Sequence, residues 1–267
     1  PARTPASRPE RLRWILHHTL TPLDIFELRR KELRGPDAPP WVATLRERLE
    51  ARFGRAVSTD DDELVVESFL YELEPTGALR RLLERARVTW RYENTLFVHG
   101  GISHWNFGRV PDRPGIVRPV ARWQQELDRW YRERLSRWSS DPTAIRGDAR
   151  QAVEDIQQYL MPLAGTRTQR RSVVTGRWSD AENMPWLPPA WVRDELRSQG
   201  IDRIVLGHTP AGDVPSFVRT PEGTFEVVCA DNSYGFREDS PSIVRIRRDS
   251  VQVAGRVRDG SLEGTRV

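Results

Sequence analysis

Residues 96–103 read LFVHGGIS and residues 204–212 read IVLGHTPAG, and the two stretches share one design. In each, an apolar run typical of a buried strand ends in a histidine, His99 or His208, that is flanked by glycine. The sheet holds such a histidine rigidly, and the neighbouring glycine leaves room for a metal ion or a phosphate group. Loops beyond strand ends are where α/β proteins bind ligands, and imidazole is a common ligand of transition metals. One such histidine alone is more often structural, but two of them followed by the acidic-polar stretch 229-CADNSYG-235 form a more specific combination that indicates a metal or phosphate site.

The other three histidines, His17, His18 and His104, lack this setting and are not predicted to be ligands. Cys229 is the only cysteine, so it cannot form a disulfide within the chain, which favours a reducing, cytoplasmic location. It lies in the apolar run 225-FEVVCA-230, which predicts a buried small side chain and not a nucleophile.

Composition and charge exclude several classes of protein. Hydrophobic residues make up 37% and charged residues 30% of the chain, as in ordinary globular proteins. No run of 18 apolar residues is present, so no membrane partner is expected. Forty-two basic and 38 acidic residues give a net charge of +4. The two signs alternate along predicted helices, and this disfavours nucleic-acid binding, which needs basic charge gathered on one face.

Hydrophobic periodicity divides the chain into a helical first third and a strand-rich last third. Residues 1–87 are predicted to be helical, with a helix start at Thr59 because three aspartates follow it. A long helix is predicted over 117–139, and others over 148–160 and 189–199, with a loop over 161–176. The long helix carries one apolar stripe, interpreted mainly as core packing, that consists of Val120, Trp123, Leu127, Trp130 and Trp138.

The strands are predicted to form a mostly antiparallel sheet. They lie near residues 95–98, 202–207, 214–220, 224–230, 242–248 and 250–257. Two long helices separate the strands that end at His99 and His208, which suits a crossover between strands of like direction. The two histidines should then meet at one sheet edge, although they are far apart in the sequence.

The succession of FVHGGIS, VLGHTP and the acidic stretch 229-CADNSYG-235 resembles the calcineurin-like metallophosphoesterase superfamily. It is closest to the phosphoprotein-phosphatase branch, which includes bacterial Shewanella-like phosphatases and diadenosine tetraphosphatases. Pro210 stands where other branches have a second histidine, which favours this branch. The resemblance implies an α/β (α+β) fold in which residues 88–267 form the C-terminal part of an αββα sandwich. Residues 1–87 would be a helical insertion or cap.

The resemblance also implies hydrolysis of a phosphomonoester or phosphoanhydride by a hydroxide that two divalent metal ions (Mn, Fe or Zn) activate. It makes His99 and His208 metal ligands. The segment 173-VVTGRWSD-180 makes Arg177 the catalytic arginine that grips phosphate, a role its guanidinium fork suits. Asp231 and Tyr234 would belong to the substrate-binding rim. The implied substrate is a phosphorylated protein or a nucleotide.

Three motifs with which this family begins, GDxHG, GDxxDRG and GNHE, do not occur in the chain. They supply the bridging carboxylate and the other ligands that two-metal hydrolysis needs. The isolated chain is therefore expected to be inactive, with the missing N-terminal half supplied in cis or in trans. The alternative is a catalytically silent interaction module, which would bind a protein partner through its helical first third and its tryptophan-rich helix.

Overall fold

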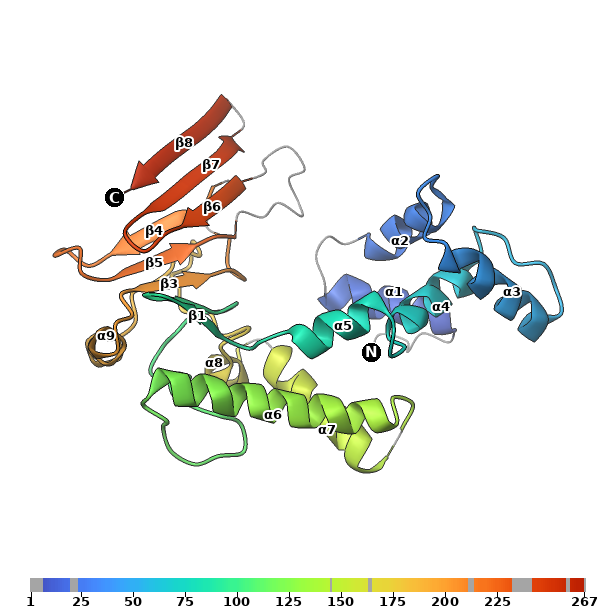
Figure 1. Cartoon of the computed structure of the whole chain (residues 1–267), viewed down its shortest axis with the longest axis horizontal. Coiled ribbons are helices and arrows are strands. Elements are labelled where there is room, and N and C mark those ends of the chain that lie inside the picture. The colour runs from blue at the N-terminus through green and yellow to red at the C-terminus, as the bar shows by residue number, and fades with distance from the viewer. Residues whose placement is uncertain are drawn as a thin grey trace. The chain divides into compact units, whose positions relative to one another are not determined.

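Helices come first along the chain and most strands last, as Figure 1 shows. The structure, a computed structural model, describes residues 7–19, 24–144, 146–162, 165–210, 214–231, 242–257 and 260–266, with the backbone alone at 18–19, 256–257 and 260–266. Helices accompany a sheet of mixed strand direction, which agrees with the predicted α/β class in its general form. The chain divides into two units, Pro1–Ala86 and Arg87–Val267. The sequence pattern placed this boundary after residue 87.

The described residues of the first unit form five helices and no strand, as predicted. They are α1 (Arg8–Thr19), α2 (Ile25–Arg34), α3 (Trp41–Phe53), α4 (Asp62–Glu72) and α5 (Ala78–Arg85). Helix α4 packs against α1, α2 and α3, and its Leu64 and Val65 are fully buried. The predicted start at Thr59 is wrong. Asp61 caps α4 instead, because its side chain accepts a hydrogen bond from the backbone N–H of Glu63 at 3.1 Å.

The second unit contains two sheets. Their strands are β1 (Trp90–Tyr92), β2 (Thr95–Phe97), β3 (Arg203–Leu206), β4 (Ser216–Arg219), β5 (Glu226–Cys229), β6 (Ser242–Ile246), β7 (Val251–Val257) and β8 (Gly260–Arg266). The first sheet has the order β1-β2-β3-β5-β4 and the second the order β6-β7-β8. All the predicted strands are present, whereas β1 and β8 were not predicted.

The expectation of one mostly antiparallel sheet is wrong. The second sheet is antiparallel, but β2, β3 and β5 run parallel at the centre of the first. The helical connection from β2 to β3 permits the first parallel pair. After β3 the chain forms β4 at the edge of the sheet and then reverses direction. Strand β5 therefore lies between β3 and β4, antiparallel to β4 and parallel to β3. This order brings the ends of three parallel strands together.

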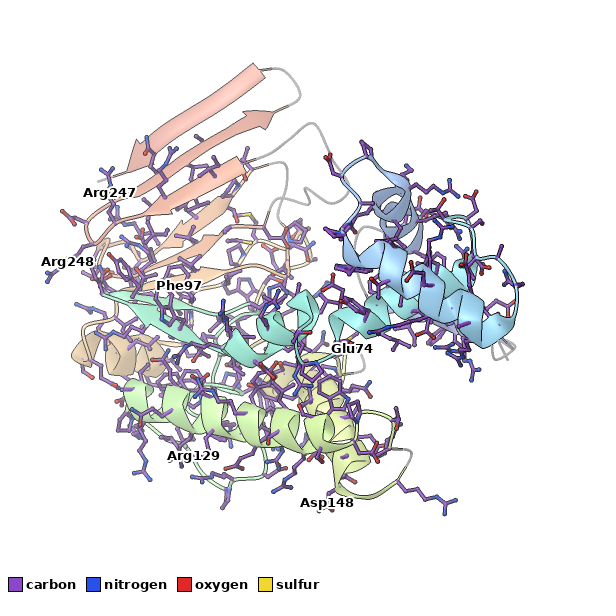
Figure 2. All side chains as sticks on the ribbon, turned by 45° about the vertical axis from the view of Figure 1, so that its right-hand side comes forward. Glu74, Phe97, Arg129, Asp148, Arg247 and Arg248 are labelled. Atoms are coloured by element: carbon purple, nitrogen blue, oxygen red, sulfur yellow. The ribbon has the colours of Figure 1, made fainter. Side chains whose placement is uncertain are left out.

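The two sheets share an apolar cluster. Val205 and Val228 of the first sheet pack with Val251 and Val253 of the second, and all four are buried. Phe97, labelled in Figure 2, packs against the same cluster. This layer fixes one face of the strands that carry the candidate site.

Helices α6 (Val120–Ser140), α7 (Gly147–Leu160), α8 (Arg167–Arg171) and α9 (Ala190–Ser198) complete the second unit. The predicted stripe of α6 is core: Val120, Trp123, Leu127 and Trp130 are buried, and Trp138 is half-buried. The short helix α8 lies inside the segment predicted to be a loop. Within the described ranges, none of the helices is long and apolar enough to span a bilayer.

Candidate metal site

Three parallel strands end at the same edge of the first sheet, and a polar residue follows each of them. His99 lies just beyond β2, His208 just beyond β3 and Asp231 just beyond β5. Backbone hydrogen bonds extend the ladder past the strands, since Gly207 N–H donates to the carbonyl of His99 at 2.9 Å. The three side chains therefore start from neighbouring points of one rigid edge.

The imidazole rings of His99 and His208 lie together. Their centroids are 5.3 Å apart and their planes make an angle of 57°. The predicted meeting of the two histidines is thus confirmed. His99 is exposed and His208 half-buried. A Cβ atom at Gly207 would lie 3.4 Å from Nδ1 of His99, so glycine leaves that side of the ring uncovered.

His208 has an unusual backbone conformation. Its φ is 65°, in the left-handed region that residues other than glycine seldom adopt. Such a conformation persists only where the surrounding structure imposes it, and it often marks a functional site. Here it aims the ring at the backbone of Thr175, with which the ring makes a hydrogen bond that favours the protonated imidazole.

Electrostatic surroundings keep both imidazoles neutral near pH 7. Burial, followed by repulsion from His99 in its protonated form and from Arg177, lowers the pKa of His208 to about 4, although Asp231 opposes the shift. Partial desolvation of the ring also lowers the pKa of His99, although the residue as a whole is exposed, and again the Asp231 carboxylate opposes the shift. A neutral imidazole keeps the lone pair that a metal ion needs.

Arg177 reaches this site from a segment folded against the His99 loop. Gly100 N–H donates to the carbonyl of Val173 at 2.8 Å, and Gly101 N–H donates to the carbonyl of Gly176 at 2.6 Å. Arg177 is exposed, yet its charge is close enough to lower the pKa of His208. The segment thus carries a cation to the edge where the two histidines lie.

Sequence reasoning missed the residue that braces this segment. The side chain of Asn106, which is 1% exposed, donates to the carbonyls of Gly101 at 2.8 Å and Ser172 at 3.1 Å. Its Oδ1 accepts from the N–H of Ser103 at 2.9 Å. No local sequence signal points to it, because Ser172 lies 66 positions further along the chain. Asn106 therefore joins the loop after β2 to the segment that carries Arg177.

The glycines of this loop are required by close backbone approach. A Cβ at Gly100 would lie 2.8 Å from the carbonyl oxygen of Gly176, and one at Gly101 would lie 2.6 Å from Cβ of Trp178. Neither residue can accept a side chain without movement of the 173–178 segment. The HGG sequence therefore lets this segment pack directly on the histidine loop.

The remaining candidate residues lie elsewhere in the structure or outside its described residues. Tyr234 is outside the described residues, as is the side chain of His18. His17 is exposed on α1, and His104 packs against Trp105 and Trp178. Cys229 is buried, and burial raises the pKa of its thiol, which agrees with a structural role.

The donor set fits part of a metal site. A histidine ligand commonly bonds a backbone carbonyl through one ring nitrogen and the metal through the other, and the bond between His208 and the backbone of Thr175 provides that orientation. In the part of the chain that is described, no group of three or more His, Cys, Asp or Glu side chains is arranged to hold a metal.

No family model, curated protein or solved structure matches the chain.

Proposed function

We propose that this chain forms part of the centre of a metal-dependent phosphoesterase with a calcineurin-like fold. His99 and His208 would bind one divalent ion, and Arg177 would bind the phosphoryl group of the substrate. The observation that carries the proposal is that the centroids of the two imidazole rings lie 5.3 Å apart at the ends of adjacent parallel strands. Two histidines with unrelated structural roles would have no reason to meet there.

Each side chain has a role that follows from its surroundings. A bound divalent ion supplies Lewis-acid activation of a phosphoryl oxygen and of water. The bond to Thr175 holds the His208 ring in place, and the glycines leave one side of the His99 ring uncovered. Arg177 is exposed at this edge, where its guanidinium can orient phosphate oxygens through two parallel hydrogen bonds. The charge of Asp231 limits the net positive potential felt by both rings.

Two imidazoles do not complete the coordination of Mn, Fe or Zn, nor do they bridge two ions. Further donors, among them a bridging carboxylate, would therefore come from another segment or another chain. It follows that these 267 residues alone should not hydrolyse p-nitrophenyl phosphate with Mn²⁺ above background. A phosphorylated protein and a nucleotide are both candidate substrates, because either would present a phosphoryl group to Arg177.

Paramagnetic broadening of NMR signals tests the metal site without any need for turnover. Mn²⁺ should broaden the ring signals of His99 and His208 before those of His17, which lies exposed on α1. His99→Ala and His208→Ala should each remove the selective broadening, whereas His17→Ala should leave it unchanged. Equal broadening of all exposed histidines would reject the metal site.

A second function, binding of a protein partner, is favoured by one observation. Trp90 and Tyr92 on the edge strand β1 are 49% and 46% exposed, and their rings lie 5.9 Å apart. Exposed aromatic residues are common at protein interfaces. The tryptophan stripe of α6 does not serve this function, because Trp123 and Trp130 are buried. Failure of the metal test would make this surface the better candidate.

A further inference from the structure

A cleft of about 360 Å³ opens in the second unit between the loop 109–114 and helices α6, α7 and α8. Helix α7 packs against both α6 and α8, and Figure 1 shows it passing behind α6. Neither member of the histidine pair lines the cleft, and its volume lies in the range of small-molecule pockets. Three arginines and two aspartates give it a strongly charged wall: Arg109, Arg113, Arg171, Asp112 and Asp155.

The two carboxylates of the cleft, Asp112 and Asp155, already have a positively charged partner. Asp112 accepts hydrogen bonds from Nε1 of Trp130 at 3.1 Å and from Nη2 of Arg134 at 2.5 Å. Asp155 lies 3.4 Å from Nε of the same Arg134, which is not one of the lining residues. Arg134 thus neutralises both Asp112 and Asp155, and neither carboxylate needs a cation bound in the cleft.

Only one of the three arginines of the cleft has a negatively charged partner among the described residues. Arg113 pairs with Glu126. Arg109 and Arg171 have no ion-pair partner among the residues that the structure describes. Nε of Arg109 is buried and has no hydrogen-bond partner, so its side chain is inserted into the protein and is not spread over the surface. The cleft therefore holds two positive charges without a counter-charge.

We propose that this cleft binds a small anion that carries phosphate or carboxylate groups, with Arg109 and Arg171 as its main ligands. Arg109 is half-buried without a counter-charge, which is unfavourable, and a bound anion would supply that charge. The exposed Arg171 adds a second cation to the same cleft. Guanidinium groups match the geometry of both kinds of oxyanion. Thr168 and Gln158 also line the cleft and offer hydroxyl and amide donors. This site is independent of the proposed phosphoesterase function.

Amide NMR titration with inorganic pyrophosphate and, separately, with succinate tests the site and distinguishes the two anions. The signals of Thr168 and Gln158 should shift and saturate with at least one of them. Tighter binding of pyrophosphate assigns a phosphorylated ligand, and tighter or equal binding of succinate assigns a carboxylated one. If neither anion shifts these signals up to about 10 mM, the proposal is wrong.

Variants of equal charge change locate the binding. Arg109→Ala and Arg171→Ala should each raise Kd about tenfold or more. Arg129, labelled in Figure 2, is exposed on α6 and does not line the cleft, so Arg129→Ala should leave Kd within about twofold. An equal loss in all three variants would show only non-specific attraction and would overturn the site. Should Arg109→Ala fail to fold, the exposed Arg171 still permits the test.

Discussion

Arg203 and Glu226 form a buried ion pair between β3 and β5, with Nε and Oε1 2.6 Å apart and each side chain 6% exposed. They begin the two strands that end near His208 and Asp231. Arg203 also donates to the hydroxyl of Thr95 on β2 at 3.2 Å and to the carbonyl of Arg247 at 2.7 Å. Arg247 lies in the turn between β6 and β7, where Figure 2 labels it. One guanidinium thus ties the three parallel strands to the second sheet.

Glu226→Gln should lower the free energy of unfolding by about 3–5 kcal/mol, because it leaves the charge of Arg203 buried without its partner. Urea denaturation measures the change. The control is Glu154→Gln, which breaks the exposed pair with Arg150 on α7 and should cost less than about 1 kcal/mol. The double variant Arg203→Met/Glu226→Leu should lose less stability than Glu226→Gln. If it loses more, the charge is not the source of the effect.

His208→Gly should be more stable than His208→Ala by about 1 kcal/mol, because glycine adopts a φ of 65° without the steric cost that alanine meets. Thermal melts of the two variants measure the difference. Both lack the imidazole, so the comparison isolates the backbone. Equal stabilities would mean that the left-handed conformation relaxes when the ring is removed.

Acid should destabilise the protein through His208. The folded-state pKa is about 4 and the unfolded value about 6.5, so between these values the unfolded chain binds the extra proton. The free energy of unfolding should therefore fall as pH drops from 6.5 to 4, by roughly 1 kcal/mol per pH unit, with no contribution above 6.5.

The measurement is urea denaturation in EDTA across this pH range. Carboxylates also titrate near pH 4, so the comparison is with His208→Gln, which should show a shallower pH dependence between 5 and 6.5. An NMR titration of the His208 ring with a midpoint near 6.5 would contradict the prediction.

Gly101→Ala should destabilise the second unit by about 1–3 kcal/mol, because its Cβ would lie 2.6 Å from Cβ of Trp178. Gly35→Ala is the control, since its φ is −66° and its nearest neighbour would lie at 3.5 Å, an ordinary contact. Tryptophan fluorescence during urea denaturation follows the change. A Gly101→Ala protein as stable as the control would show that the 173–178 segment does not pack on the histidine loop.

Local patterns in the sequence were sufficient to predict the helices of the first unit, the buried stripe of α6 and the burial of Cys229. They also placed His99 and His208 just beyond strand ends. Side-chain periodicity and glycine placement report on a residue's immediate backbone, and these features depend on little else. The same patterns misplaced a helix start at Thr59, because several polar residues in a row can each act as the cap.

The parallel direction of β2 and β3 followed from the helical connection between them, whereas the direction and place of β5 were decided only in three dimensions. Residues of β5 read alike in a parallel or an antiparallel sheet, and its place between β3 and β4 depends on pairing between distant segments. That pairing sets Asp231 beside the histidines. The brace at Asn106, the ion pair of Arg203 and the low pKa of His208 depend likewise on contacts between residues far apart in the chain. Desolvation and charge act through space, so no local pattern encodes them.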